Sequence, residues 1–242
     1  MIAGRDTVRC GLRLRRAAVA APARPVAAIP PARRPRIGAM DQDAPLQVRR
    51  VGADGLARHL DAVAALRIAV FRDWPYLYAG DLDYERRYLA AYAASPRSVC
   101  VLAFDRGRVV GASTGIPLAD DAEPFRRPFR DAGRDPGRVF YFGESVLLPA
   151  YRGRGIGHAF FDHREAHARA LGGFDTTAFC AVDRAPGDPR RPPGHRGNDA
   201  FWRGRGYVRQ PGLVVQLDWD ELGRGEVAHA LTFWTRALEQ AA

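Results

Sequence analysis

The 242-residue sequence predicts a mixed α/β domain with a central sheet that is mostly antiparallel. Apolar stretches of strand length alternate with stretches of helical periodicity along most of the chain. A short turn at Gly107 joins two of the strand-like stretches, residues 99–104 and 109–116, into a hairpin. A strand over residues 139–148, a helix and a strand over residues 174–182 form a crossover that pairs the two strands in parallel.

The apolar content of 47% is sufficient for one domain of ordinary size. The sequence predicts three parts: a basic leader over residues 1–44, a folded domain over residues 45–221 and a helical C-terminal extension over residues 222–242. The leader is rich in alanine, proline and arginine and poor in acids, so we expect it to be disordered. It is compatible with an organellar transit peptide or with a physiological start at Met40.

The formal net charge of +10 is concentrated in the first 40 residues, which contain nine arginines and one aspartate. A basic arm of this kind can bind nucleic acid or an anionic membrane through phosphate groups. We favour a solvated leader and expect neither partner, and no apolar run approaches the length that spans a bilayer. Cys10, Cys100 and Cys180 lack the spacing of a metal site, and free thiols are typical of a cytoplasmic protein.

Further elements flank the hairpin. Residues 46–51 form a predicted strand, and residues 56–71 repeat leucine and alanine at helical spacing. An aromatic loop over residues 74–78 follows, and residues 83–94 form a second predicted helix that ends before a proline. After the hairpin, residues 119–138 are rich in proline, arginine and aspartate and are expected to form a long surface excursion.

The second half of the chain contains the crossover helix, expected over residues 156–171. A polar excursion precedes a short helix around residues 199–203, and residues 207–209 and 213–219 are expected to close the sheet as an antiparallel pair. The tail contains three apolar residues with the spacing of one helical face: Leu231, Trp234 and Leu238. This spacing predicts a helix that docks on the domain or on the second subunit of a homodimer.

Six residues between a predicted strand and a predicted helix form a glycine-rich basic turn: Arg152, Gly153, Arg154, Gly155, Ile156 and Gly157. The start of a helix presents unpaired N–H groups, and glycines allow a diphosphate to approach the main chain. This arginine turn therefore predicts an anion-binding site. It is not a Walker loop, because the chain contains no lysine, and its glycines lack the spacing of the dinucleotide-binding fingerprint.

Together with Leu147, Pro149 and Tyr151, the arginine turn resembles the acetyl-CoA loop of the GNAT acetyltransferase superfamily. The resemblance implies a GNAT fold: a mixed, mostly antiparallel sheet with helices on both faces and a parallel, splayed strand pair at the acetyl-CoA site. It implies that acetyl-CoA is the co-substrate and that the arginine turn binds its diphosphate. It also implies main-chain hydrogen bonds to the pantetheine arm from three strand residues, Ser145, Val146 and Leu147. The Leu147 N–H is then expected to face the thioester oxygen.

Glu144 is the only carboxylate within residues 139–148, where apolar residues surround it in the sequence. Acetyl transfer to an amine requires a group that receives the amine proton. Desolvation is expected to raise the pKa of Glu144 toward neutrality, so we predict Glu144 as the general base. The alternative is an ion pair with a buried arginine that only fixes the strand. Strict alternation separates Glu144 from Tyr141 and Ser145, so a β-bulge decides which side chains meet the substrate.

The resemblance places an acceptor pocket between the first two helices, where three aromatic residues lie: Trp74, Tyr76 and Tyr78. The alternative role of these residues is packing within the loop or the core. Members of the superfamily often use a tyrosine of the last helix to protonate the leaving thiolate. Trp202 takes that position here, and indole cannot act as this acid; Tyr141, Tyr207 or water could replace it.

His163 and His167 share one helical face but lack the glutamate position of the zinc-protease pattern, so no metal is expected. The sequence thus predicts an N-acetyltransferase that moves the acetyl group of acetyl-CoA to an amine acceptor by direct attack. A small-molecule acceptor is favoured over a protein. The alternatives are a protein N-acetyltransferase, a catalytically silent acyl-CoA-binding or sensing module, and a nucleic-acid-binding protein that acts through the basic leader.

Overall fold

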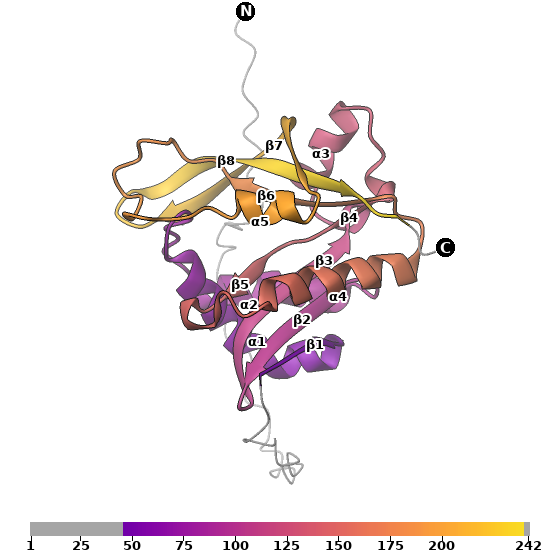
Figure 1. The fold of residues 1–242 in the computed structure, drawn as a ribbon, viewed down its shortest axis with the longest axis horizontal. Coiled ribbons are helices and arrows are strands. Elements are labelled where there is room, and N and C mark those ends of the chain that lie inside the picture. The colour runs from indigo at the N-terminus through magenta and orange to yellow at the C-terminus, as the bar shows by residue number, and fades with distance from the viewer. Residues whose placement is uncertain (1–45, 240–242) are drawn as a thin grey trace, which may run out of the picture.

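Residues 46–239 are described by a computed structural model, shown in Figure 1. The described chain has five α-helices: α1 (Ala53–Phe71), α2 (Leu82–Ala94), α3 (Glu123–Asp131), α4 (Ile156–Leu171) and α5 (Asp199–Gly204). Its strands are β1 (Gln47–Val51), β2 (Val99–Asp105), β3 (Arg108–Pro117), β4 (Val139–Tyr141), β5 (Ser145–Leu147), β6 (Thr176–Val182), β7 (Val208–Glu221) and β8 (Gly225–Ala237). The leader predicted over residues 1–44 lies outside the described residues.

The strands form one mixed sheet in the order β1-β2-β3-β4-β6-β8-β7, with β5 paired to β3 off this path. Neighbouring strands are antiparallel except β4 and β6, which pair in parallel and are connected along the chain through α4. Arg106 and Gly107 turn the β2–β3 hairpin with φ values of 49° and 74°. The predicted fold class is therefore confirmed, with a mostly antiparallel sheet and one parallel strand pair.

Helices cover both faces of the sheet. Figure 1 shows α4 crossing in front of the sheet, while α1 and α2 lie behind it. Strand β2 supplies Cys100, Leu102 and Phe104 to the apolar cluster beside α1 and α2, and Val101 and Ala103 to the cluster beside α4. Because both faces are covered, β2 is apolar at each of these positions. None of the helices within residues 46–239 is both long and apolar enough to span a bilayer.

The C-terminal segment is a strand, so the helix predicted over residues 222–242 is wrong. Strand β8 lies between β6 and β7 and pairs with both. Leu231 and Phe233 pack into the cluster beside α1 and α2, and Trp234 packs into the cluster beside α4. A strand that is buried on both faces carries apolar residues at adjacent positions, and these imitate helical spacing.

Strand β7 contains residues 208–209 and 213–219, which were predicted as parts of two short strands. A register shift between Gln210 and Val214 interrupts its pairing with β8, and Pro211 lies within this shift. A bulge absorbs the proline, so the chain continues in the same direction instead of turning. The two segments therefore pair with β8 and not with each other.

The surface excursion predicted over residues 119–138 contains helix α3. Pro124 lies in the first turn of this helix, where a missing N–H costs little, and Pro128 lies inside it. The side chain of Phe129 is fully buried, and its ring centre lies 5.0 Å from that of Phe233. Tertiary packing stabilises a helix that the prolines conceal in the sequence.

Candidate active site

The strand predicted over residues 139–148 divides into β4 and β5 at a β-bulge. The Gly143 N–H donates to the main-chain oxygen of Thr114 at 3.2 Å, and the Thr114 N–H donates to the oxygen of Glu144 at 3.2 Å. Two residues of one strand thus face a single residue of β3, which bends the bulged strand. On the far side of the bulge, β5 pairs with β3 and leaves the β4–β6 ladder.

The main chain of β5 presents an open edge. The Leu148 N–H donates to the oxygen of Val110 at 3.0 Å, and the groups that face one partner alternate along an antiparallel ladder. Val146 therefore directs its N–H and C=O toward β3, whereas Ser145 and Leu147 direct theirs away from it. In contrast to the expectation for all three, Val146 is not available for main-chain bonds to a ligand at this edge.

The bulge also changes which side chains share a face. Tyr141, Glu144 and Val146 all point into the layer of α1 and α2, although strict alternation separates Glu144 from Tyr141. Glycine is required at position 143 because a Cβ atom there would overlap the Tyr92 hydroxyl. The bulge thus brings the carboxylate of this segment to the face that α1 and α2 cover.

Arg164 of α4 holds the bulge from the opposite face. Its Nη1 donates to the main-chain oxygens of Thr114 at 3.2 Å and Glu144 at 3.1 Å, and its Nη2 donates to Ser145 Oγ at 2.9 Å. The residue is 1% exposed, and its guanidinium lies 4.1 Å from the ring centre of Phe142. Burial lowers the pKa of Arg164 to about 10, which leaves it charged at neutral pH. Nothing in the sequence singles out Arg164, because its partners Thr114, Glu144 and Ser145 are distant along the chain.

Glu144 is buried and is not surrounded by apolar side chains alone. Its Oε2 accepts a hydrogen bond from the Tyr88 hydroxyl at 2.9 Å and lies 2.7 Å from Arg67 Nη1. Arg67 also pairs with the buried Glu85 through Nε. Within the described chain, Glu144 Oε1 is buried without a hydrogen-bond partner. The ion pair that the sequence left open as an alternative is therefore present, and one carboxylate oxygen still lacks a partner.

The arginine turn follows a short 3₁₀ helix and ends where α4 begins. Gly153 and Gly155 have φ values of 76° and 80°, the left-handed conformation that favours glycine. Ile156 is 2% exposed and anchors the turn, whereas residues 152–155 are exposed. No side chain in the described chain caps the start of α4, so its first N–H groups are available to an anion.

The three aromatic residues between α1 and α2 have different surroundings. Tyr78 is 7% exposed and hydrogen-bonded to Glu85, so it packs in the core. Tyr76 is partly buried; burial raises its pKa, and the charge of Glu144 acts in the same direction, so its hydroxyl stays protonated. Trp74 is partly exposed. Trp74 and Tyr76 thus keep part of their surface exposed, whereas Tyr78 is buried in the core.

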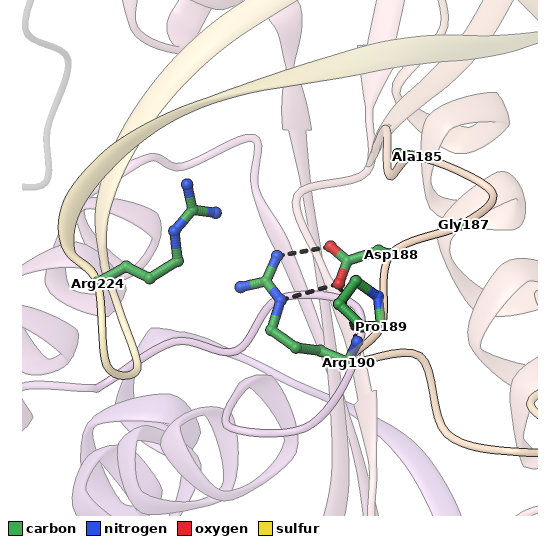
Figure 2. A pocket seen from close by; sticks show the side chains of 6 residues that line it. All are labelled: Ala185, Gly187, Asp188, Pro189, Arg190 and Arg224. Atoms are coloured by element: carbon green, nitrogen blue, oxygen red, sulfur yellow. Dashed lines mark hydrogen bonds and ion pairs between the residues drawn. The ribbon is translucent and has the colours of Figure 1, made fainter.

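A surface hollow of about 460 Å³ opens between the segment after β6 and the β7–β8 turn (Figure 2). Six residues line this arginine hollow: Ala185, Gly187, Asp188, Pro189, Arg190 and Arg224. Arg190 and Arg224 both pair with Glu221, which is fully buried. Arg184 Nη1 lies 2.9 Å from Glu221, and its Nη2 donates to the main-chain oxygen of Tyr76 at 3.0 Å. The hollow is thereby connected to the aromatic loop between α1 and α2.

The candidate proton donors are engaged with other groups. The Tyr207 hydroxyl is buried and lies 2.9 Å from Thr177 Oγ1. The Tyr141 hydroxyl lies 3.1 Å from the Cys180 sulfur. Burial raises the pKa of both tyrosines, so both remain protonated at neutral pH. Trp202, at the position of the expected tyrosine, packs against aromatic rings of β6 and β8.

Helix α4 contains three histidines, His158, His163 and His167, of which the last two were singled out by their spacing. His167 Nε2 lies 3.1 Å from the main-chain oxygen of Arg97, and its ring packs against Phe140. Within residues 46–239, no three His, Cys, Asp or Glu side chains converge in a way that could hold a metal ion.

The fold is shared with solved acetyltransferase structures. An N-acetyltransferase from Staphylococcus aureus Mu50 is 12% identical, with a TM-score of 0.54, and the match covers 81% of this chain and 100% of that one. An aminoglycoside 6'-N-acetyltransferase complexed with coenzyme A is 14% identical, with a TM-score of 0.53 and coverage of 81% and 99%. A Salmonella typhimurium structure with its cofactor acetyl-CoA is 15% identical, with a TM-score of 0.50 and coverage of 82% and 97%. At these identities the similarity shows the fold alone.

The sequence itself matches the Acetyltransferase (GNAT) family over residues 65–189, which is more than half of the chain. The chain therefore belongs to this family. The matched segment extends from the middle of α1 to the arginine hollow and contains β5 and the arginine turn. Among curated proteins, none matches this chain.

Proposed function

We propose that this protein transfers the acetyl group of acetyl-CoA to the amine of a small molecule. One observation carries the proposal. An open strand edge at β5 is followed along the chain by a helix, α4, whose start has no side-chain cap. An acyl-CoA has a pantetheine arm with amides that can pair with a strand edge, and a diphosphate that can bind N–H groups at a helix start. CoA or acetyl-CoA is present in two solved structures of similar fold.

The binding residues follow from this geometry. The exposed Arg152 and Arg154, with the N–H groups of residues 153–157, bind the diphosphate. Ser145 and Leu147 pair with the pantetheine arm through their outward-facing main-chain groups. The Leu147 N–H then donates to the thioester oxygen, where negative charge develops during attack.

The chemical step requires one proton transfer from the acceptor. The amine nitrogen attacks the thioester carbon, the new C–N bond forms, and the C–S bond breaks to release the CoA thiolate. Glu144 receives the amine proton, directly or through water, at Oε1, while Tyr88 and Arg67 hold Oε2. The thiolate takes a proton from water, since Tyr207 and Tyr141 are engaged elsewhere. Trp74 and Tyr76 contact the acceptor.

One other function has a specific observation in its favour. Trp202 stands where the superfamily often has a proton donor, and Tyr207 is buried against Thr177. A protein that binds acyl-CoA without turnover is consistent with both facts. Cys100 and Cys180 are free thiols, which supports the proposed location in the cytoplasm for either function.

Two measurements on the full chain test the proposal. Isothermal titration with CoA measures binding, and release of free CoA from acetyl-CoA with a panel of small amines measures transfer. We expect micromolar CoA affinity and amine-dependent CoA release. CoA binding without release for any amine supports the silent module, and the absence of CoA binding contradicts both functions.

A further inference from the structure

We propose that the acceptor carries a carboxylate beside its amine, and that Arg224 and Arg190 bind this carboxylate in the arginine hollow. This inference rests on the proposed acetyl transfer and names the chemical class of the acceptor: an amino acid or a similarly small acidic amine.

The side chains around the hollow carry more positive than negative charge. Three guanidinium groups, those of Arg184, Arg190 and Arg224, surround the buried carboxylate of Glu221. Asp188 supplies a second carboxylate and forms a forked pair with Arg190, with distances of 2.9 and 2.5 Å. One positive charge of this group is left uncompensated, and an anionic ligand would neutralise it.

Two further titratable groups belong to this cluster, and their charge states follow from their surroundings. His229 lies 3.5 Å from Glu221, yet burial and the charge of Arg184 lower its pKa to about 4. His229 is therefore neutral at pH 7 and adds no charge to the group. Hydrogen bonds from Arg190 hold the pKa of Asp188 well below its usual range, so Asp188 stays ionised.

The arginines differ in how accessible they are to a ligand. The Arg184 side chain is 9% exposed, and it binds Glu221 and main-chain oxygens of the aromatic loop. The Arg224 side chain is 52% exposed and contacts Glu221 through Nη1 at 3.3 Å. In Figure 2 the guanidinium groups of Arg224 and Arg190 face each other across the hollow. A planar guanidinium matches a carboxylate through two parallel hydrogen bonds, so this pair can hold the acid from two sides.

The rest of the lining fits a small aliphatic ligand. Ala185, Gly187 and Pro189 offer short apolar surfaces, and a Cβ atom added at Gly187 would meet nothing within 4 Å. The acidic group of a small amine can therefore enter while its carbon chain lies against the apolar wall. We expect selection for charge and little selection for side-chain shape.

The hollow lies on the side of the molecule where CoA would bind. The segment that supplies residues 185–190 continues to His195, whose ring centre lies 6.3 Å from that of Trp74. Burial lowers the pKa of His195, and the charges of Arg191 and Arg152 add to this effect; Arg152 belongs to the arginine turn. In Figure 1 the β7–β8 turn and the start of α4 both lie on the left side. The segment that lines the hollow thus continues to the aromatic loop and, at His195, comes within the influence of the Arg152 charge in the proposed cofactor site.

Matched pairs of amines test the inference with the full-length protein. Glycine, alanine, methionine and glutamate are compared with their C-terminal amides as acceptors, by release of CoA from acetyl-CoA. We expect the acids to be used at least about tenfold better in kcat/KM than the amides, mainly through KM. The Arg224→Gln variant should lose this preference and keep its CoA affinity. Arg203→Gln, at an exposed arginine of α5 that pairs with Asp199, is the control and should keep both.

Other results would overturn the carboxylate assignment or contradict the proposed function. Equal use of acids and amides, or an unchanged preference in Arg224→Gln, overturns the carboxylate assignment. A preference for aminoalkyl phosphonates over the matched acids overturns it in favour of a phosphate group. If CoA binds and none of the amines reacts, binding of N-acetyl amino acids and of their amides is compared by titration; equal affinities also overturn it. Failure to bind CoA contradicts the proposed function instead.

Discussion

The main-chain oxygen of Glu144 accepts a hydrogen bond from the guanidinium of Arg164 at 3.1 Å. Glu144 thus contacts two arginines on opposite faces of the sheet, because Arg67 of α1 binds its side chain. The first turn of α4 is also the proposed diphosphate site. One helix therefore positions both the proposed base and the proposed cofactor, and the bulge between them cannot shift without breaking buried hydrogen bonds.

Replacement of Arg164 by lysine tests this arrangement. Lysine keeps the charge but has one nitrogen in place of the two that bind Thr114, Glu144 and Ser145, so some of these buried groups lose their partner. We expect a loss of about 2–4 kcal/mol in the free energy of unfolding. Turnover per folded molecule should also fall about tenfold or more, because the bulge moves the base. Arg169→Lys, on an outer position of the same helix, should change neither quantity appreciably. Normal turnover in the folded Arg164 variant would show that the bulge does not depend on this side chain.

Replacement of Glu144 by glutamine tests the proposed base. Glutamine keeps the size and removes the basicity, so turnover should drop by about 10² to 10⁴ while CoA affinity stays the same. Stability should change little, because Arg67 keeps Glu85 as its partner. The quantities to measure on one preparation are CoA release, CoA affinity and Tm.

Glu85→Gln is the matched control for that variant. It removes the same charge from the same arginine, at a position that lies on α2 and away from the bulge. We expect it to retain turnover within a few-fold. If the two variants lose turnover equally, the ion-pair cluster as a whole matters, and Glu144 is not the proton acceptor.

Replacement of Gly155 by valine tests the diphosphate site. Gly155 has a φ of 80°, and valine there strains the turn and places a branched side chain over the first N–H groups of α4. CoA affinity should fall more than about tenfold, which corresponds to about 1.4 kcal/mol. Gly133→Val is the control, since Gly133 has a φ of 69° and an equally open Cβ position after α3. Similar CoA affinities of the two variants would reject the assignment of the arginine turn.

The carboxyl group of Asp121 supports a prediction about pH. Burial raises its pKa from the usual 3.8 to about 6 in the folded protein. Well below pH 4 the carboxyl group is protonated in both the folded and unfolded states and does not change their relative free energy. As the pH rises from about 4 to 6, ionisation is favourable in the unfolded state and not in the folded state, so the free energy of unfolding falls. Asp121→Asn should therefore stabilise the protein by about 1–2 kcal/mol at pH 7, after allowance for partial exposure, and by nearly nothing at pH 4.

Chemical denaturation of both proteins at pH 4, 5, 6 and 7 measures this difference. Asp120→Asn is the control, because Asp120 is exposed and pairs with Arg97 at 2.6 Å. Its substitution should show no such rise in stability with pH. A difference between Asp121→Asn and the wild type that is constant over the range would mean that Asp121 titrates normally.

Local signals in the sequence were sufficient for the hairpin, the crossover and the helix start at the arginine turn. Each depends on residues within a few positions of one another, such as Gly107 at the β2–β3 turn. The two largest errors concern elements that tertiary packing stabilises. Leu231 and Trp234 pack on opposite faces of a central strand, and their spacing imitates that of a helix. Pro128 argues against a helix in the sequence, but packing of Phe129 stabilises α3.

The sequence predicts where the candidate site lies along the chain, but it does not predict which side chains contact one another there. The position of Glu144 beside the cofactor loop follows from chain order, but its partners Arg67 and Tyr88 come from helices that precede it by dozens of residues. The bulge at Gly143 depends on Thr114 in another strand. Arg164, in a helix rich in charged residues, looks like a surface residue until the fold buries it. Such contacts depend on the tertiary structure and leave no spacing pattern.

The central position of β8 has a consequence for how the chain acquires its structure during synthesis. Strands β6 and β7 leave the ribosome before β8, yet they become neighbours of β8 and not of each other. Until β8 emerges, the edges of both strands have unpaired N–H and C=O groups, which favour aggregation and slow long-range pairing. Nascent chains that stall before residue 225 should therefore need chaperone protection, and release of the last dozen residues of the described chain should be the event that completes the sheet.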